Sequence, residues 1–367
     1  MEVDAMIMSD KCKAHVDSCR FCWMCHHICP VGNATGQERS TPRARALGIS
    51  LVNRGAIELE EIMDNIYECA GCMACVNDCV TGWNPVMFTR EVRLAAALEG
   101  KLPDYINALV DNCLDTGNAY GKTALCDTIA SAISAHAEKT DTLLVLGADA
   151  RYMACSQGAK AIETLEKAEV NFTVLKDEPA TGAQLDFLIG AADEAKSEMQ
   201  AMADVLNQYK TAVIYDPADS KVIKQRYAEY GIELTCRVTT YTSYLAQLLK
   251  EGSLKAKKGE KAVVYQDPFQ LSRDLEETEE VREVISAFAT LGEFHLNRKE
   301  TVWAGSILMA QYMPKVIDLV AKRRIFNATS IGAKAIVTTS VSEYTALKNV
   351  EQDVVEILSL EDLILGE

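Results

Sequence analysis

"CRFCWMCHHICP", residues 19–30, and "CAGCMACVNDCV", residues 69–80, are two copies of one cysteine spacing. Each follows the pattern C-x2-C-x2-C-x3-C, and together they contain eight of the thirteen cysteines of the chain. The eight are Cys19, Cys22, Cys25 and Cys29 in the first run and Cys69, Cys72, Cys75 and Cys79 in the second. Isolated cysteines are ordinarily small buried hydrophobic residues. Thiols clustered in this way instead indicate metal chemistry.

The spacing is that of the bacterial ferredoxins with two [4Fe–4S] clusters. In those proteins three closely spaced thiolates bind one cube, and the fourth cysteine of the run ligates the other cube. We therefore predict two [4Fe–4S] clusters with crossed ligation, held close together as a two-step path for electrons. The predicted ligands are Cys19, Cys22, Cys25 and Cys79 for cluster A, and Cys69, Cys72, Cys75 and Cys29 for cluster B. Only the first run ends in Cys-Pro, and Val80 stands at the corresponding position of the second.

Other interpretations of the cysteines are weaker. Zinc sites use ligands in two pairs and do not need the shared x2-x2-x3 spacing. His26 and His27 are interpreted as packing residues or hydrogen-bond donors to sulfur, since four cysteines per cube leave no vacant ligand position. The five cysteines outside the runs are expected to be lone, unpaired thiols: Cys12, Cys113, Cys126, Cys155 and Cys236.

The bulk composition of the 367-residue chain is that of an ordinary globular protein, with 49% hydrophobic and 25% charged residues. Its formal net charge of −16 argues against a general role in binding nucleic acid or anionic membranes. We see no apolar run of about 18 residues that would span a bilayer and no basic start followed by an apolar leader. We therefore expect a cytoplasmic protein, in which disulfides rarely persist.

The segment between the two runs predicts helices rather than β-hairpins. Ser40 or Thr41 is a candidate N-cap, and Pro42 suits the first helical turn. Apolar residues then recur at three- and four-residue steps, as in Leu59, Ile62, Met63 and Ile66. We therefore predict an α-helical two-cluster ferredoxin domain over residues 1–115.

From residue 140 onward, strands are predicted to alternate with helices. The strands "DTLLVLGAD", "NFTVLKD" and "TAVIYDP" alternate with the helices "CSQGAKAIETLEKAEV" and "EAKSEMQAMADVLNQYK". After the linker "SLKAKKGEK" the order restarts with the strands "KAVVYQDP", "EFHLNR" and "KAIVTTSV" and the helices "LEETEEVREVISAFATL" and "LMAQYMPKVIDLVAKRRIFNATS". Two β-α-β-α-β units predict a duplicated α/β fold with parallel, Rossmann-like sheets, at residues 140–258 and 259–367.

A helical two-cluster ferredoxin followed by two α/β repeats resembles a known family over essentially the whole chain. Its members are the iron–sulfur subunits of glycolate oxidase, anaerobic glycerol-3-phosphate dehydrogenase, lactate-utilisation proteins and the D subunit of heterodisulfide reductase. That family usually carries a Cys-Cys-Gly (CCG) motif and further cysteines in each repeat. The resemblance implies that residues 140–258 and 259–367 are degenerate CCG-type repeats.

This chain departs from the family at the motif cysteines. Other residues stand at these positions: Ala180 and Thr181 before Gly182, Trp303 and Ala304 before Gly305, Gln266 and Phe269 in "YQDPFQLSR", and Ser340 and Glu343 in "TTSVSEYT". Phenylalanine, alanine and tryptophan cannot ligate iron. We therefore expect repeats that keep the fold without the family's additional clusters, and no disulfide-reductase chemistry.

The resemblance implies an electron-transfer subunit with no catalytic residues of its own. The expected donor is an FAD-linked oxidoreductase subunit of the 2-hydroxy-acid or glycerol-3-phosphate type, and the acceptor a ferredoxin, an electron-transferring flavoprotein or a quinone-linked protein. A catalytic heterodisulfide-reductase-like subunit would need further cysteines beside an open site. A sensor of oxygen or iron that acts on nucleic acid would need a helix-turn-helix or a basic face. "GNAYGKT", residues 117–123, has three residues rather than four between its glycines, so no phosphate-binding loop is expected.

Overall fold

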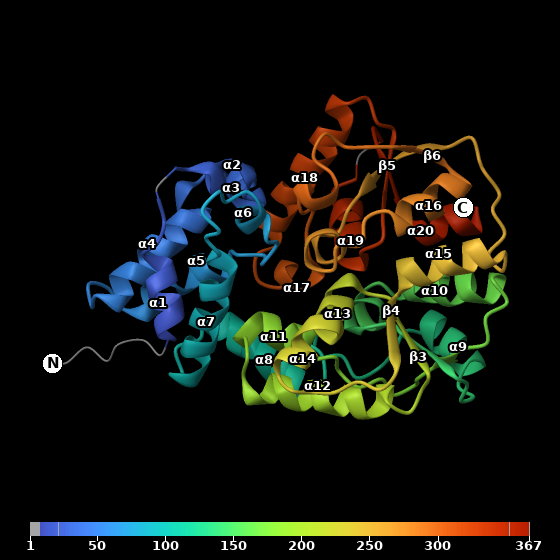
Figure 1. The fold of residues 1–367 in the computed structure, drawn as a ribbon, viewed down its shortest axis with the longest axis horizontal. Helices are drawn as coiled ribbons and strands as arrows, with labels where there is room; N and C mark the ends of the chain where they lie inside the picture. The colour runs from blue at the N-terminus through green and yellow to red at the C-terminus, as the bar shows by residue number, and fades with distance from the viewer. Residues whose placement is uncertain (1–7, 21, 352, 367) are drawn as a thin grey trace.

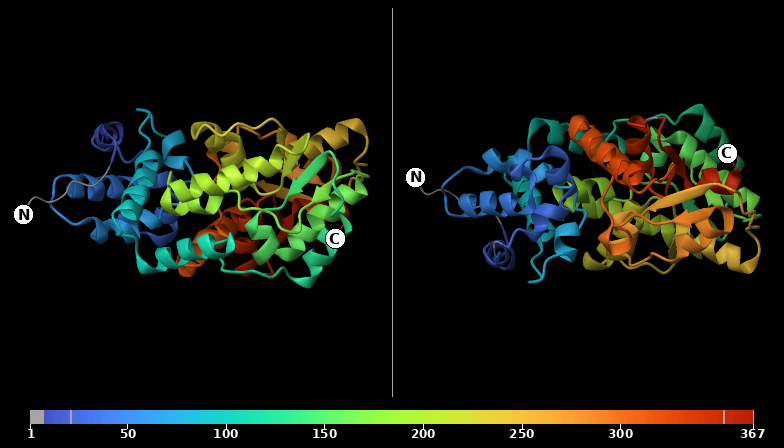
Figure 2. Two further views of the ribbon diagram at one scale, coloured as in Figure 1. Left: turned by 90° about the horizontal axis from the view of Figure 1, so that it is seen from below. Right: turned by 90° about the horizontal axis from the view of Figure 1, so that it is seen from above.

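The structure, a computed structural model, describes residues 8–20, 22–351 and 353–366. The N-terminal part is helical, and the remainder forms two four-stranded parallel sheets flanked by helices. The helical part lies at one side of the molecule, and the two sheets with their helices lie at the other (Figure 1). Two further views show an elongated molecule with the helical part at one end (Figure 2).

Short helices dominate the N-terminal part and carry both cysteine runs. Its α-helices are α1 (Asp10–Val16), α2 (Met24–Ile28), α3 (Pro30–Thr35), α4 (Pro42–Asn53), α5 (Met63–Tyr67), α6 (Ala74–Asn77), α7 (Pro85–Leu98) and α8 (Asp104–Thr116), with 3₁₀ turns η1 (Glu38–Ser40) and η2 (Leu59–Ile62). The predicted start of α4 is confirmed: the Thr41 side chain accepts a hydrogen bond from the Ala44 backbone N–H, and Pro42 occupies the first turn.

The first α/β unit, as we call the first sheet and its helices, has the strand order β2-β1-β3-β4, all parallel. Its strands are β1 (Thr142–Val145), β2 (Thr173–Val174), β3 (Thr211–Ile214) and β4 (Arg237–Thr240). Its helices are α9 (Asp127–Ala135), α10 (Cys155–Lys167), α11 (Ala183–Ile189), α12 (Asp193–Leu206), α13 (Pro217–Lys221), α14 (Tyr227–Glu229) and α15 (Tyr241–Glu251), with π-helical turns η3 (Asp149–Met153) and η4 (Val222–Arg226).

The second α/β unit repeats this order as β6-β5-β7-β8, again all parallel. Its strands are β5 (Ala262–Gln266), β6 (Thr290–Gly292), β7 (Ala335–Thr338) and β8 (Glu356–Ser359). Its helices are α16 (Glu280–Phe288), α17 (Ile307–Ala310), α18 (Pro314–Ser330), α19 (Val341–Asn349) and α20 (Leu360–Leu365), with a π-helical turn η5 (Gln270–Asp274) and a 3₁₀ turn η6 (Arg298–Glu300).

Parallel sheets and the predicted chain order are confirmed, but three details of the prediction are wrong. Each sheet has a fourth strand, β4 or β8, whose short β-branched or apolar sequence carries too little pattern to stand out. Strand β6 lies at Thr290–Gly292 rather than at residues 293–298. The long helix predicted from residue 308 is broken into α17 and α18 at Pro314, because proline lacks the N–H that would continue the helix.

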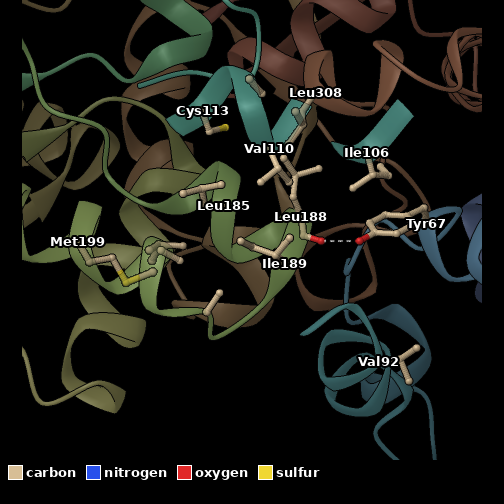
Figure 3. Packing of buried hydrophobic residues seen from close by; sticks show 14 of the residues in the cluster. Tyr67, Val92, Ile106, Val110, Cys113, Leu185, Leu188, Ile189, Met199 and Leu308 are labelled. Carbon is tan, nitrogen blue, oxygen red and sulfur yellow. Dashed lines mark hydrogen bonds between the residues drawn. The ribbon is translucent and has the colours of Figure 1, made fainter. Parts of the chain in front are cut away.

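Clusters of buried hydrophobic residues join the three parts. Side chains of α7 and α8 pack with those of α11 and α12, and the Tyr67 hydroxyl donates a 2.7 Å hydrogen bond to the Leu188 carbonyl (Figure 3). A second cluster contains Val213 of β3 and Val263 of β5, so the two α/β units share one core. Full burial of each such side chain contributes about 1.5–3 kcal/mol. No helix in the described part of the chain is both long and apolar enough to cross a membrane.

Candidate iron–sulfur centre

The two cysteine runs adopt the same backbone path. In each run the residue after the second cysteine has a left-handed backbone conformation: Trp23 has φ 67° and Met73 has φ 60°. A short helix follows and carries the third cysteine, α2 in the first run and α6 in the second. Left-handed backbone is uncommon for residues other than glycine, so its presence at both positions indicates that each loop is shaped by its cysteines.

The last cysteine of the first run lies with three cysteines of the second run. A small cavity between the runs is lined by Cys29, Cys69, Cys72 and Cys75, together with Arg45 and other residues. Cys29 reaches it because α2 ends there and α3 begins, and its sulfur accepts a 3.5 Å hydrogen bond from the Gly32 N–H. The structure thus brings together the four cysteines assigned to cluster B.

Burial controls the chemistry of these thiols. It raises the pKa of Cys72 to about 11 and also raises the pKa of Cys29 and Cys75, where the neighbouring sulfurs raise it further. Buried thiols of this kind hold their protons until a metal displaces them, because metals bind the thiolate. Four cysteines around one cavity, three of them buried, therefore fit an iron–sulfur cluster.

Three arginines, Arg45 in the cavity lining and Arg93 and Arg273 on the backbone of its cysteines, would offset the negative charge of a cluster. The Arg45 side chain is 2% exposed, and it donates hydrogen bonds of 2.9 Å to the Asn65 carbonyl and 2.8 Å to the Ser40 carbonyl. Arg93 of α7 donates a 2.7 Å hydrogen bond to the Cys69 carbonyl, and Arg273 of η5 donates one of 2.8 Å to the Cys72 carbonyl. Arg273 lies far from the runs in sequence, Arg93 lies in the helix that follows the second run, and no pattern in the chain marked either of them.

The cysteines assigned to cluster A lie nearer the surface. Cys22 is exposed, Cys19 and Cys79 are partly exposed, and Cys25 is buried. Burial raises the pKa of Cys25 to about 11, with further increases from Cys19, Cys29 and Cys22. Cys79 follows α6, which packs against α2. Burial alone would raise the pKa of Cys79, but hydrogen bonds from Thr81 and nearby backbone groups lower it below the usual value.

The histidines beside the first run have other contacts. The His26 Nε2 atom lies 3.1 Å from a Glu38 carboxylate oxygen, and the His26 and His27 rings meet edge to face with centroids 5.3 Å apart. No three His, Cys, Asp or Glu side chains of the described residues converge on a single metal ion. Cubane thiolates bind four separate irons and stand further apart than the ligands of one ion.

The expectation of five unpaired cysteines outside the runs is wrong for two of them. Cys126 and Cys155 form a disulfide, with Cα atoms 6.6 Å apart and a sequence separation of 29. Cys126 precedes α9 and Cys155 begins α10, and these two helices pack together. Sequence spacing could not show this pairing, because only the packing of the helices brings the two sulfurs together. Cys12, Cys113 and Cys236 are free and buried, as expected.

Comparison with known proteins identifies the N-terminal part. Residues 15–83, which include both cysteine runs, match the family described as the 4Fe-4S dicluster domain. The chain carries a 4Fe-4S dicluster domain. Such a domain indicates an electron-transfer iron–sulfur protein, and the name "dicluster" agrees with two cysteine runs.

Two further comparisons concern the whole chain. No curated protein matches it. Among solved structures it is similar to glutamate racemase isoform RacE1 from Bacillus anthracis, with 14% sequence identity and a TM-score of 0.31 over 62% of this chain and 80% of that chain.

Proposed function

We propose that this chain is the electron-transfer iron–sulfur subunit of a multi-subunit redox complex. Its ligands would be Cys19, Cys22, Cys25 and Cys79 for cluster A, and Cys69, Cys72, Cys75 and Cys29 for cluster B. The cavity that Cys29 shares with three cysteines of the second run is the observation that carries the proposal. Each [4Fe–4S] cluster, when bound, supplies a one-electron carrier.

The surroundings of the two cysteine sets support a direction for the electron path. Cys29 and Cys72 belong to a buried cluster with Trp303 and Val320 of the second α/β unit, so cluster B would lie inside the molecule. Next to the cysteines of cluster A, by contrast, Trp23 is 44% exposed and Val80 is 84% exposed. Exposed apolar residues beside a redox centre suit the docking of a partner protein. The partner would therefore exchange electrons with cluster A.

The proposed donor is an FAD-linked dehydrogenase subunit of the 2-hydroxy-acid or glycerol-3-phosphate type. The proposed acceptor is a ferredoxin, an electron-transferring flavoprotein or a quinone-linked protein. The two α/β units, residues 140–258 and 259–367, are proposed to be degenerate CCG-type, Rossmann-like repeats. Both units retain the motif glycine, and both glycines are packing constraints: a Cβ on Gly182 would lie 2.5 Å from Met199, and one on Gly305 would lie 2.4 Å from Ala346.

An anoxic affinity purification from native cell extract tests the proposal. We expect a flavin-containing subunit to co-purify and to reduce the clusters in stopped-flow measurements, while the isolated chain turns over no substrate. Val80→Glu should slow this reduction, and Phe326→Glu, which changes another exposed apolar residue on α18 (61% exposed), should not. Substrate turnover by the isolated chain, or equal effects of the two variants, would refute the proposed role or the proposed docking face.

A further inference from the structure

A second, larger cavity lies between the two α/β units. Its volume is about 200 Å³, and its lining includes residues that directly follow strands β1, β3 and β7. The carboxyl ends of parallel strands are where α/β sheets bind ligands. Its lining also includes Cys69, Ala70 and Gly71, the segment that begins the second cysteine run. The cavity is thus distinct from the four-cysteine cavity but shares a wall with it.

Six acidic residues of the first α/β unit line this cavity: Asp149, Glu178, Asp186, Glu198, Asp216 and Asp219. Glu178 pairs with Arg151 and Asp186 with Arg90, and the cluster of interest consists of three carboxylates, those of Asp149, Asp216 and Asp219. Asp216 is 5% exposed, and its Oδ1 atom accepts a 2.7 Å hydrogen bond from the Ala218 N–H. Its other oxygen, Oδ2, is buried and has no hydrogen-bond partner among the described residues. A buried carboxylate oxygen without a partner is costly, so the cavity lacks a donor at this point.

The other two carboxylates have only neutral partners. Asp219 accepts a hydrogen bond from the Thr181 hydroxyl. Asp149 accepts hydrogen bonds from Tyr120, Gln184 and Ser342, the last of which belongs to the second α/β unit. Within the described ranges no lysine or arginine forms an ion pair with any of the three aspartates. Lys221 and Arg151 also line the cavity, but Lys221 is paired with Asp274 and Arg151 with Glu178.

The second α/β unit also buries acids, and one of them, Asp267, is paired with an arginine. Glu343 stands three residues after the N-cap of α19, as Asp219 does after the N-cap of α13. Glu343 lies near Arg324 of α18, a buried cation that lowers the carboxyl pKa, although burial raises that pKa more, to about 8. In the same unit, Asp267 accepts hydrogen bonds of 2.7 and 2.9 Å from Arg282.

In the chain, helix α12 lies between β2 and β3 of the first unit, as α18 lies between β6 and β7 of the second. Its buried residues are Ala195, Met199, Met202, Ala203 and Leu206, none of them basic. Among the described residues no lysine or arginine pairs with Asp149, Asp216 or Asp219, whereas in the second unit Arg282 pairs with Asp267. Burial, and then the charge of Asp149, raise the pKa of Asp216 to about 7.

The lining favours an organic cation over a metal ion. No three metal-binding side chains of the described residues converge on one point. The lining also includes the apolar side chains of Phe269, Trp303 and Met309, all from the second α/β unit. Small-molecule sites have this composition, mostly apolar with a few placed polar groups. A cavity lined by acids and by large apolar side chains suits a carbon skeleton that ends in a positive charge.

We propose that this cavity binds a small organic molecule carrying an ammonium group, which is received by Asp216 and Asp219. The ammonium group donates to the Oδ2 atom of Asp216 and supplies the cationic partner that Asp216 and Asp219 lack among the described residues. The rest of the molecule lies against the apolar wall. Because the cavity reaches Cys69–Gly71, the bound molecule changes the surroundings of a cysteine assigned to cluster B.

Isothermal titration calorimetry of the full chain, purified under anoxic conditions, tests this site with n-butylammonium, the neutral n-butanol and Mn²⁺ as probes. We expect saturable one-to-one binding of n-butylammonium and none of n-butanol. Asp216→Asn and Asp219→Asn should each weaken binding about tenfold or more, the range for losing a charged hydrogen bond. Asn caps a helix as well as Asp does, so Asp216→Asn retains the start of α13. Asp193→Asn is the matched control, because that aspartate is fully at the surface of the same unit (95% exposed) and should bind like the wild type.

A second readout separates binding from folding. The EPR spectrum of the reduced wild-type protein should change on addition of n-butylammonium, and the spectra of the two variants without ligand should match that of the wild type. The proposal is overturned if the wild type shows no saturable n-butylammonium binding at millimolar concentration, or if n-butanol binds equally well. Binding of Mn²⁺ that is lost in Asp216→Asn would overturn it in favour of a metal site.

Discussion

Cys29, the last cysteine of the first run, lines the same cavity as Cys69, the first cysteine of the second run. Neighbouring sulfurs, Cys69 among them, contribute to the raised pKa of Cys29, after the larger effect of burial. Two segments far apart in sequence therefore supply sulfur to one buried place. This relationship gives the ligand assignment a direct test.

Single serine variants should separate crossed from uncrossed ligation. Cys29→Ser should damage the cluster held by Cys69, Cys72 and Cys75, because its sulfur lies in their cavity. Cys79→Ser should damage the other cluster. EPR of each reduced variant identifies the surviving signal, and Cys236→Ser, at a buried free cysteine outside the runs, is the control. If each variant instead loses the cluster of its own run, the crossed assignment is wrong.

Metal analysis of the anoxically purified chain should give about eight iron and eight acid-labile sulfide, as two [4Fe–4S] clusters require. The disulfide between Cys126 and Cys155 takes no part in this count, so Cys155→Ala should leave it unchanged. A content near four iron atoms per chain would mean that the chain binds one cluster rather than two. A content clearly above eight would mean that an α/β unit binds a cluster after all.

The buried guanidinium of Arg45 should set the potential of cluster B. Its fixed positive charge lies near Cys69, Cys29 and Cys75 and favours the reduced, more negative cluster. Arg45→Gln should lower the reduction potential of cluster B by on the order of 50–100 mV, the size of one unscreened charge at short range. EPR-monitored redox titration measures this shift. Arg54→Gln, at an arginine whose side chain is 68% exposed, should leave both potentials nearly unchanged, since water screens its charge.

Asp216 should make the protein less stable as pH rises. Its pKa in the fold is raised to about 7, mainly by burial and then by Asp149, so the folded chain holds a proton that the unfolded chain has lost. Stability is therefore fully present below the ordinary aspartate pKa and decreases as pH rises towards 7. Asp216→Asn removes this dependence and should stabilise the chain at pH 8 by about 1–3 kcal/mol, and by less at pH 5.5.

Anoxic thermal unfolding at the two pH values measures this difference. Asp193→Asn, at the exposed aspartate, should change stability little at either pH. A variant Asp216→Asn that is equally or less stable than the wild type at pH 8 would show that the Asp216 carboxylate is compensated in the fold.

Much of the architecture could be predicted from local sequence. The start of α4 at Pro42 and the strands β1, β3, β5 and β7 follow from capping chemistry and from runs of buried apolar residues, which depend on near neighbours in the chain. Strand β6 was predicted at the wrong residues, and the break in the helix before Pro314 was not predicted. There the tertiary contacts and the missing proline N–H outweigh a weak periodic signal.

The sequence by itself determined the dicluster domain, because the spacing of eight cysteines is a covalent property of the chain. It also determined that two similar α/β units follow, since the hydrophobic pattern repeats. Only the tertiary structure decided which arginines surround the cysteines and that Cys126 reaches Cys155. It alone placed Asp149, Asp216 and Asp219 around one cavity without a basic partner among the described residues. These relationships depend on how helices and strands far apart in sequence pack together, and packing leaves no periodic mark in the chain.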